Sequence, residues 1–166
     1  MTSLLEVEAL TIGFGKAPPV VGESGSGKTL TCRSALRILP EAAQVRGGRV
    51  TFYGETGEVD MLQASERRLR DIRGDRISMI FQEPMRSLSP LHRLGDQVSE
   101  VLKLHRSIGA GEAKRRVLEQ FDKVGFVDPD RAWSSYPFEM SGGMRQRAMI
   151  AMAMVAKPEL LIADEP

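Results

Sequence analysis

The most informative stretch of this chain is Gly22-Glu23-Ser24-Gly25-Ser26-Gly27-Lys28-Thr29. It matches the phosphate-binding pattern G-x-x-x-x-G-K-[ST] at every fixed position. Glycines let backbone N–H groups curve around phosphate oxygens, because no Cβ atoms obstruct the concave loop. The Lys28 ammonium can reach the β- and γ-phosphates, and the Thr29 hydroxyl can hold Mg²⁺. The pattern therefore predicts a binding site for a nucleoside triphosphate.

A helix is expected directly after this loop. Apolar side chains recur at i, i+3, i+4 and i+7 before Pro40 ends the run, at the positions Cys32, Ala35, Leu36 and Leu39. The amino terminus of such a helix directs the positive end of its dipole at the same anion. A Gly/Ser-rich surface turn is the alternative for residues 22–29, and the helical periodicity argues against it.

Charge balance and cysteine content limit the partners and the compartment. The 166 residues contain 23 basic and 22 acidic side chains, so no overall field favours nucleic acid or acidic lipid. Cys32 is the one cysteine, which indicates core packing and a reducing compartment. Residues 1–10 lack the features of a signal peptide, and the longest apolar run, residues 148–156, is about half a membrane span. We therefore expect a soluble chain with no nucleic-acid partner, which reaches a membrane only through another protein.

Two stretches near the N-terminus have strand character. Residues 4–12 alternate, with Leu5, Val7 and Ala9 on one side, which predicts a half-buried strand. A phosphate-binding loop usually follows a buried strand of continuous apolar residues. Residues 17–21 precede the loop here, and their two prolines suit a central strand poorly. Part of the usual strand is therefore expected to be missing.

The middle of the chain alternates short strands and helices. The Gly-Gly pair at residues 47–48 predicts a turn, and residues 49–53 predict a short strand. Residues 65–73 predict a charged surface helix with Ser65 as its N-cap. Residues 77–81 predict a buried strand.

Residues 86–139 change in character, with helical periodicity, many charges and few strand signals. Two apolar stripes fall at helical spacing, and their members are Val98, Val101, Leu102, Val117, Leu118, Phe121 and Val124. Residues 141–156 predict a further helix, and residues 160–163 a buried strand. We interpret the chain as an α/β fold in which residues 1–85 and 140–166 form a parallel-sheet core with a small antiparallel β part. Residues 86–139 form a helical subdomain inserted between two strands of the sheet.

Three polar stretches could complete a nucleotide site. In a phosphate-loop fold Asp164 would hold Mg²⁺ and Glu165 would polarise the attacking water, although an ordinary exit from a strand is the alternative. The stretch Ser141-Gly142-Gly143 opens a second helix that could grip phosphate, or it forms a flexible N-cap. Gln82 follows another apolar strand, and a simple turn residue is its alternative.

Together these stretches resemble the motifs of the ATP-binding-cassette (ABC) ATPases, a family of P-loop NTPases, over nearly the whole chain. Residues 22–29 are similar to the Walker A motif, residues 160–165 to Walker B, Gln82 to the Q-loop and residues 141–147 to the signature motif. Several segments resemble the dipeptide and oligopeptide importer branch, namely Ile80-Phe81-Gln82-Glu83-Pro84-Met85, Ser87-Leu88-Ser89-Pro90, Tyr136-Pro137 and Ser141-Gly142-Gly143-Met144-Arg145-Gln146-Arg147. Residues 90–92 and 104–106 are similar to its microcin-C-type members.

The resemblance implies ATP binding and hydrolysis that energise ABC-type import of peptides or related solutes. Two nucleotide domains of this family pair head to tail, so Ser141, Gly142 and Gly143 would contact the γ-phosphate of ATP held by the other domain. Gln82 would contact Mg²⁺ or water and sense the transmembrane permease, while a solute-binding protein would act indirectly. The chain would lie peripherally at the cytoplasmic face of the membrane. Phe14 would stack on adenine, with plain core packing as the alternative.

Three departures from the family pattern shape the remaining expectations. Relatives carry more residues between the positions equivalent to Phe14 and Gly22, and Phe138 stands where this branch usually has histidine. The chain stops at Pro166, before the D-loop and the switch histidine of the family. We expect residues 1–166 to be a fragment of a longer ATPase, incomplete at the C-terminus and poorly active by itself. A non-transport ABC ATPase and a catalytically inactive nucleotide-binding fragment remain the alternatives.

Overall fold

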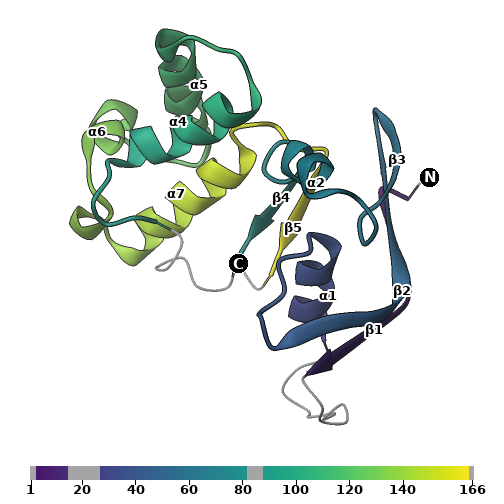
Figure 1. Cartoon of the computed structure of the whole chain (residues 1–166). Coiled ribbons are helices and arrows are strands. Elements are labelled where there is room, and N and C mark those ends of the chain that lie inside the picture. Colours follow the sequence, from purple (N-terminus) through teal and green to yellow (C-terminus); the bar gives the residue numbers. More distant parts are fainter. Residues whose placement is uncertain (1–2, 15–26, 82–87, 165–166) are drawn as a thin grey trace. The chain divides into compact units, whose positions relative to one another are not determined.

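A computed structural model describes residues 3–14, 27–81 and 88–164. The chain divides into two compact units, Met1–Arg73 and Gly74–Pro166. The first contains a three-stranded antiparallel sheet with two helices, and the second contains a pair of parallel strands with the remaining helices (Figure 1). The expected α/β class is confirmed, including both its parallel and its antiparallel β parts.

The sheet of the first unit has the order β1-β2-β3 and consists of β1 (Leu5–Phe14), β2 (Ala43–Gly54) and β3 (Gly57–Asp60). The turn predicted at residues 47–48 is wrong, because β2 passes through both glycines while it pairs with β1. A two-residue connection joins β2 to β3, and Gly54 pairs with Gly57 across it. Strand β3 was not predicted from the sequence.

A β-bulge explains why β2 requires glycine at this point. The pairing of β1 with β2 shifts in register between Glu8 and Thr11, and Ala9 has a positive φ of 47°. Gly48 has a φ of 101°, and a Cβ added to it would lie 2.6 Å from the Cα of Leu10. A bulge inserts one unpaired residue into a strand. The side chains after it therefore lie on the opposite face of the sheet from the one that simple alternation predicts.

The more buried side of β1 changes across this bulge, from Leu5 before it to Leu10 and Ile12 after it, whereas the exposure of Val7 lies before the bulge and does not result from it. Val7 is 39% exposed and Ala9 is exposed, whereas Leu10 and Ile12 are half-buried. The strand itself is therefore confirmed, but the prediction that Leu5, Val7 and Ala9 share its buried side is wrong. An alternation rule counts residues in steps of two, and one extra residue reverses the count.

Two helices accompany this sheet. Helix α1 (Lys28–Ala35) has Leu36 as its C-cap, so it ends before Pro40, and Leu39 lies outside it. The Arg73 guanidinium donates hydrogen bonds to the carbonyl oxygens of Leu36 (2.7 Å) and Arg37 (3.1 Å). These carbonyls belong to the end of α1, where a cation and hydrogen-bond donors are favourable.

Helix α2 (Glu66–Ile72) begins as predicted, because the Ser65 hydroxyl accepts a hydrogen bond of 3.2 Å from the Arg68 N–H. It is charged at its surface, as expected, and it buries Leu69 and Ile72. The N-cap hydrogen bond and the burial of these two apolar side chains in the first unit stabilise this short helix.

The second unit contains the parallel pair β4 (Ile77–Ile80) and β5 (Leu160–Ala163). The register runs from Ile77 opposite Leu160 to Ile80 opposite Ala163. Both strands were predicted, but the burial expected for β5 is wrong at Leu161 and Ala163, which are exposed. In the part of the chain that the structure describes, this sheet has two strands, which leave part of β5 uncovered.

The helices of the second unit pack on one another around a shared core. They are α4 (Leu94–His105), α5 (Ala110–Lys123), α6 (Pro129–Ser134), the 3-10 turn η1 (Pro137–Glu139) and α7 (Gly142–Met154). The predicted apolar stripes supply this core, since Val98, Leu102, Val117 and Phe121 are fully buried. Between residues 88 and 139 the structure describes helices and no strand. The subdomain boundaries at 86 and 139 stay a prediction.

Charged side chains join the helices to the strands inside this unit. The Arg106 guanidinium, just after α4, donates to the Asp75 carboxylate (3.0 Å) and to the Ala156 carbonyl (2.8 Å). Arg76 and Glu159 form a largely buried ion pair of 2.6 Å at the amino ends of β4 and β5. Among the described residues, no helix is long and apolar enough to cross a membrane.

Candidate functional site

The start of α1 has the form expected of an anion site. Gly27 is the N-cap with a left-handed φ of 72°, and its carbonyl accepts the Thr31 N–H at 2.8 Å. Among the residues that the structure describes, no side chain caps this helix start, and none lies within 4 Å of a Cβ added to Gly27. Lys28 and Thr29 are the first two helical residues. The left-handed backbone conformation at this helix terminus therefore suits an anion such as phosphate.

Much of the predicted phosphate loop lies outside the described residues, namely Gly22, Glu23, Ser24, Gly25 and Ser26. Phe14 is the last residue of β1 and is 41% exposed. Helix α1 contacts β1 within the first unit. A partly exposed aromatic residue thus ends the strand that α1 contacts.

Asp164 extends the parallel pairing at the carboxyl end of β5. Its N–H donates to the Ile80 carbonyl at 3.0 Å, and the residue is only 4% exposed. Aspartate is almost never this buried without compensating charges or hydrogen bonds. Ligands of α/β proteins bind beyond the carboxyl ends of parallel strands, and β4 and β5 end together here. Gln82 and Glu165, which follow these two strands in the sequence, lie outside the described residues.

The start of α7 is a second open helix terminus. Ser141 is its N-cap, and the Ser141 hydroxyl accepts the Met144 N–H at 3.3 Å. Gly142 and Gly143 are exposed, and a Cβ on either would have nothing within 4 Å. The glycines therefore leave the first backbone amides of α7 accessible from outside.

The turn before α7 is pre-organised in a way that was not predicted from the sequence. The Glu139 carboxylate accepts the Tyr136 N–H at 2.7 Å, which holds the start of η1. The rings of Tyr136 and Phe138 stack with centroids 5.4 Å apart, and Phe138 is 68% exposed. The available signal was Glu139 three residues after Tyr136, because a glutamate at that position can reach back to the N–H of the residue that opens the turn.

The described residues of the predicted site are divided between the two units. Phe14, Gly27, Lys28 and Thr29 belong to the first unit, and Ser141, Gly142, Gly143 and Asp164 to the second. Among the described residues, no cluster of histidine, cysteine, aspartate and glutamate could by itself hold a metal ion.

Comparison with known proteins decides the family. The family model described as "ABC transporter" matches residues 6–166. This chain belongs to the ABC transporter family. The resemblance and the fold class inferred from the sequence are therefore confirmed.

Several relatives of this ABC transporter chain have names that refer to transport. It is 51% identical over 153 residues to the "Probable peptide ABC transporter ATP-binding protein y4tR" of Sinorhizobium fredii, which covers 92% of this chain and 44% of the relative. It is 50% identical over 153 residues to the "Peptidoglycan transport ATP-binding protein YejF" of Agrobacterium fabrum, with 92% and 27% covered. The chain spans less than half the length of these relatives.

A third relative bears on the missing segment. The "Uncharacterized ABC transporter ATP-binding protein YejF" of Escherichia coli is 44% identical over 184 aligned positions, covering 99% of this chain and 34% of that protein. Because this chain has 166 residues, at least 18 aligned positions (184 minus 166) hold no residue from it. A gap of this size fits the segment expected between Phe14 and Gly22, whose location stays a prediction.

Solved structures show the same fold. "Dimeric Structure of MJ0796, a Bacterial ABC Transporter Cassette" matches with a TM-score of 0.71 and 25% identity, covering 84% of this chain and 56% of that one. The "Dimeric structure of a post-hydrolysis state of the ATP-binding cassette MJ0796 bound to ADP and Pi" matches with a TM-score of 0.76 and 21% identity, covering 96% and 73%. The α/β cassette fold is therefore shared.

Proposed function

We propose that this chain binds ATP with Mg²⁺ and belongs to a subunit that hydrolyses ATP to energise the import of peptides or related solutes. The observation that carries this proposal is the left-handed Gly27 that opens α1 without a side-chain cap and is followed by Lys28. Membership of the ABC transporter family and the peptide-related names of its relatives support the same function.

In this proposal residues 22–29 surround the phosphates. Lys28 places its ammonium on the β- and γ-phosphates, and Phe14 offers its exposed ring to adenine. The open helix start supports these roles, because a charged phosphate needs unobstructed backbone amides.

In this proposal the metal and the water are held by Thr29 of α1 and by residues that follow β4 and β5 in the sequence. Thr29, Gln82 and Asp164 would hold Mg²⁺, which neutralises charge on the phosphates when it is bound. Glu165 would accept a proton from the attacking water, and Gln82 would orient that water. The burial of Asp164 at the end of β5 supports its assignment.

A second cassette would complete the site. Ser141, Gly142 and Gly143 would contact the γ-phosphate of ATP held by the other cassette of a head-to-tail dimer. The open space at both glycines supports this role, and the similar cassette MJ0796 is described as dimeric. Residues 86–139 would face the transmembrane permease at the cytoplasmic side of the membrane. Solute selection would then belong to a binding protein and the permease.

The decisive experiment is a titration with a fluorescent ATP analogue. Lys28→Ala should weaken binding about ten- to a hundredfold, because it removes charge-assisted contacts of about 1.5–3 kcal/mol. Lys123→Ala, an exposed lysine of α5, is the matched control and should leave the affinity unchanged. Equal affinities of the original chain and Lys28→Ala would refute the proposal.

A further inference from the structure

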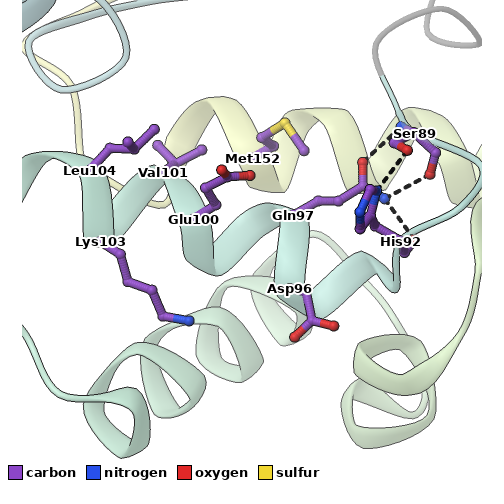
Figure 2. A pocket seen from close by; sticks show the side chains of 9 residues that line it. All are labelled: Ser89, His92, Asp96, Gln97, Glu100, Val101, Lys103, Leu104 and Met152. Atoms are coloured by element: carbon purple, nitrogen blue, oxygen red, sulfur yellow. Dashed lines mark hydrogen bonds between the residues drawn. The ribbon is translucent and has the colours of Figure 1, made fainter.

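Two hollows of the second unit lie outside the residues assigned to ATP, and they differ in the groups that line them. The larger hollow, of about 690 Å³, lies along α4, and both acidic and basic side chains line it (Figure 2). Figure 2 also shows that the Gln97 amide in this hollow is already engaged, because it is hydrogen-bonded to Ser89 and His92. Mixed charges and satisfied polar groups do not favour one class of ligand.

The smaller hollow, of about 320 Å³, lies at the carboxyl ends of α5 and α7 and beside β5. We call it the α5–α7 pocket, and its lining residues are Gln120, Lys123, Met154, Lys157, Pro158 and Leu161. Among the residues that the structure describes, its lining includes two lysines and no carboxylate. The charged groups of this pocket therefore all have one sign.

Gln120 is a buried polar side chain of this pocket. The residue is only 8% exposed, and its side-chain amide has no hydrogen-bond partner among the residues that the structure describes. Its backbone carbonyl is used by the end of α5, where it accepts the Val124 N–H at 3.1 Å. Buried amides are normally paired, because an unpaired one has lost its hydrogen bonds to water. A ligand oxygen in the pocket would satisfy the amide of Gln120.

The two lysines make the mouth of the pocket positive. Lys123 is the last residue of α5, and Lys157 follows α7 with its N–H donating to the Met154 carbonyl at 2.9 Å. Both are exposed, and neither forms an ion pair with a residue that the structure describes. The carboxyl end of each helix contributes about half a negative charge, which the two full positive charges exceed. The balance therefore favours an anionic group.

The remaining lining of the pocket is apolar. Met154 and Leu161 are exposed, and Pro158 between them is half-buried. Methionine adapts its shape to irregular apolar surfaces. The volume is near the lower end of small-molecule sites, which hold roughly 300–1,000 Å³. The pocket therefore suits a small molecule with an anionic end and an apolar end.

We propose that the α5–α7 pocket binds a small amphiphilic carboxylate. The carboxylate lies between Lys123 and Lys157, where one of its oxygens accepts a hydrogen bond from the Gln120 amide. The alkyl chain lies on Met154 and Leu161. This site is separate from the nucleotide site, and the inference does not depend on the proposed function.

Octanoate and octan-1-amine test this proposal, because they share an alkyl chain and carry opposite charges. The ¹³C-methyl NMR signals of methionine in residues 1–166 report where each compound binds, since Met154 lines this pocket and Met152 lines the hollow along α4. Octanoate should shift the Met154 signal in a saturable way. It should bind about five- to thirtyfold more tightly than octan-1-amine, as expected when attraction to the lysines becomes repulsion.

Three variants identify the groups that hold the carboxylate. Lys123→Gln and Lys157→Gln should each weaken octanoate about two- to fivefold, which is the range of an exposed ion pair. Gln120→Leu keeps the size of the side chain and removes the amide, and it should also weaken octanoate. Lys103→Gln is the matched control, because it removes the same charge from an exposed lysine of α4 outside this pocket.

Equal affinity of octanoate and octan-1-amine, no saturable shift of the Met154 signal, or an equal effect of Lys103→Gln and Lys157→Gln would overturn the proposal. Lys123→Gln should leave the affinity for the ATP analogue unchanged. Failure of the original chain to bind the analogue would therefore count against the proposed function, whereas the octanoate titrations test the α5–α7 pocket alone.

Discussion

At the residue scale, a tight packing constraint lies at Gly95 of α4. A Cβ added there would lie 2.1 Å from the Cδ2 of Trp133, which is far inside normal contact. The missing side chain lets the indole ring of Trp133 lie directly against α4. Lys114 also lies over the Trp133 ring, with its Nζ 5.6 Å from the centre of the indole.

Gly95→Ala should therefore lower the free energy of unfolding by about 1–3 kcal/mol through overpacking. Gly111→Ala is the control, because Gly111 lies in α5 with nothing within 4 Å of an added Cβ. That change should be neutral or stabilising, since alanine favours a helix by up to about 1 kcal/mol. Urea denaturation of both variants measures the difference. Equal stability of the two variants would contradict the role of Trp133.

A second residue-scale prediction concerns Tyr53, whose hydroxyl donates a hydrogen bond of 3.0 Å to the Glu6 carboxylate across β1 and β2. This hydrogen bond is the main reason why the pKa of Tyr53 is raised above 10.0. A raised phenol pKa means that the contact is present below pH 10 and is lost as the pH rises through the pKa of the folded chain.

An ultraviolet titration on a Tyr136→Phe background follows Tyr53 alone, because the chain has two tyrosines. Glu6→Gln should bring the pKa of Tyr53 closer to 10.0, whereas Glu119→Gln on α5 should not change it. An identical titration curve for Glu6→Gln would show that the carboxylate is not the cause.

At the element scale, Arg106 connects three elements of the second unit. It follows α4, and its guanidinium bonds to Asp75 before β4 and to the Ala156 carbonyl after α7. One planar group with several donors can join two acceptors in fixed directions, which a lysine cannot reproduce. This residue therefore sets the position of α4 relative to the strands β4 and β5.

Arg106→Ala should reduce the free energy of unfolding by about 1–2 kcal/mol, a value lowered for the partial exposure of the pair. Arg106→Lys should recover only part of this loss, because it keeps the charge but replaces the two donor nitrogens, Nε and Nη2, by a single nitrogen. Amide hydrogen exchange should increase at the end of α4 in the alanine variant. Full recovery by lysine would show that charge alone matters.

At the scale of the whole molecule, the proposed head-to-tail dimer can be tested with mixtures of two variants. Each complete site would combine the Lys28 of one chain with the Ser141 of the other. A mixture of Lys28→Ala and Ser141→Arg subunits, both in the full-length protein, should therefore contain dimers with one intact site. Nucleotide-dependent dimer formation, followed by energy transfer between labelled subunits, should recover in that mixture.

The control for this mixture is a subunit that carries both substitutions, combined with the unsubstituted protein. Every heterodimer of that pair has a defect in each of its two sites, so it should form fewer nucleotide-dependent dimers than the first mixture. Equal recovery in both mixtures would rule out the head-to-tail arrangement of Lys28 and Ser141.

Local sequence features predicted most of the secondary structure and the family. Ser65 and Ser141 cap α2 and α7 as expected, and the apolar stripes of α4 and α5 enter the core. These features depend on neighbours within about one or two helical turns, so a single sequence contains them. The motifs of residues 22–29 and 141–147 are equally local, and they indicated the family from the sequence alone.

Features that depend on distant partners were decided only by the tertiary structure. Gly47-Gly48 has the local composition of a turn, but β1 lies opposite it and its bulge fills the space beside Gly48. That bulge reversed the buried side of β1. The parallel pairing of β4 with β5 and the contact of Gly95 with Trp133 join residues that are far apart in the sequence. The chain by itself determined which segments form helices and where phosphate could bind, because caps, periodicity and glycine loops are local. Strand register and close packing needed the folded chain, because each joins residues that only folding brings together.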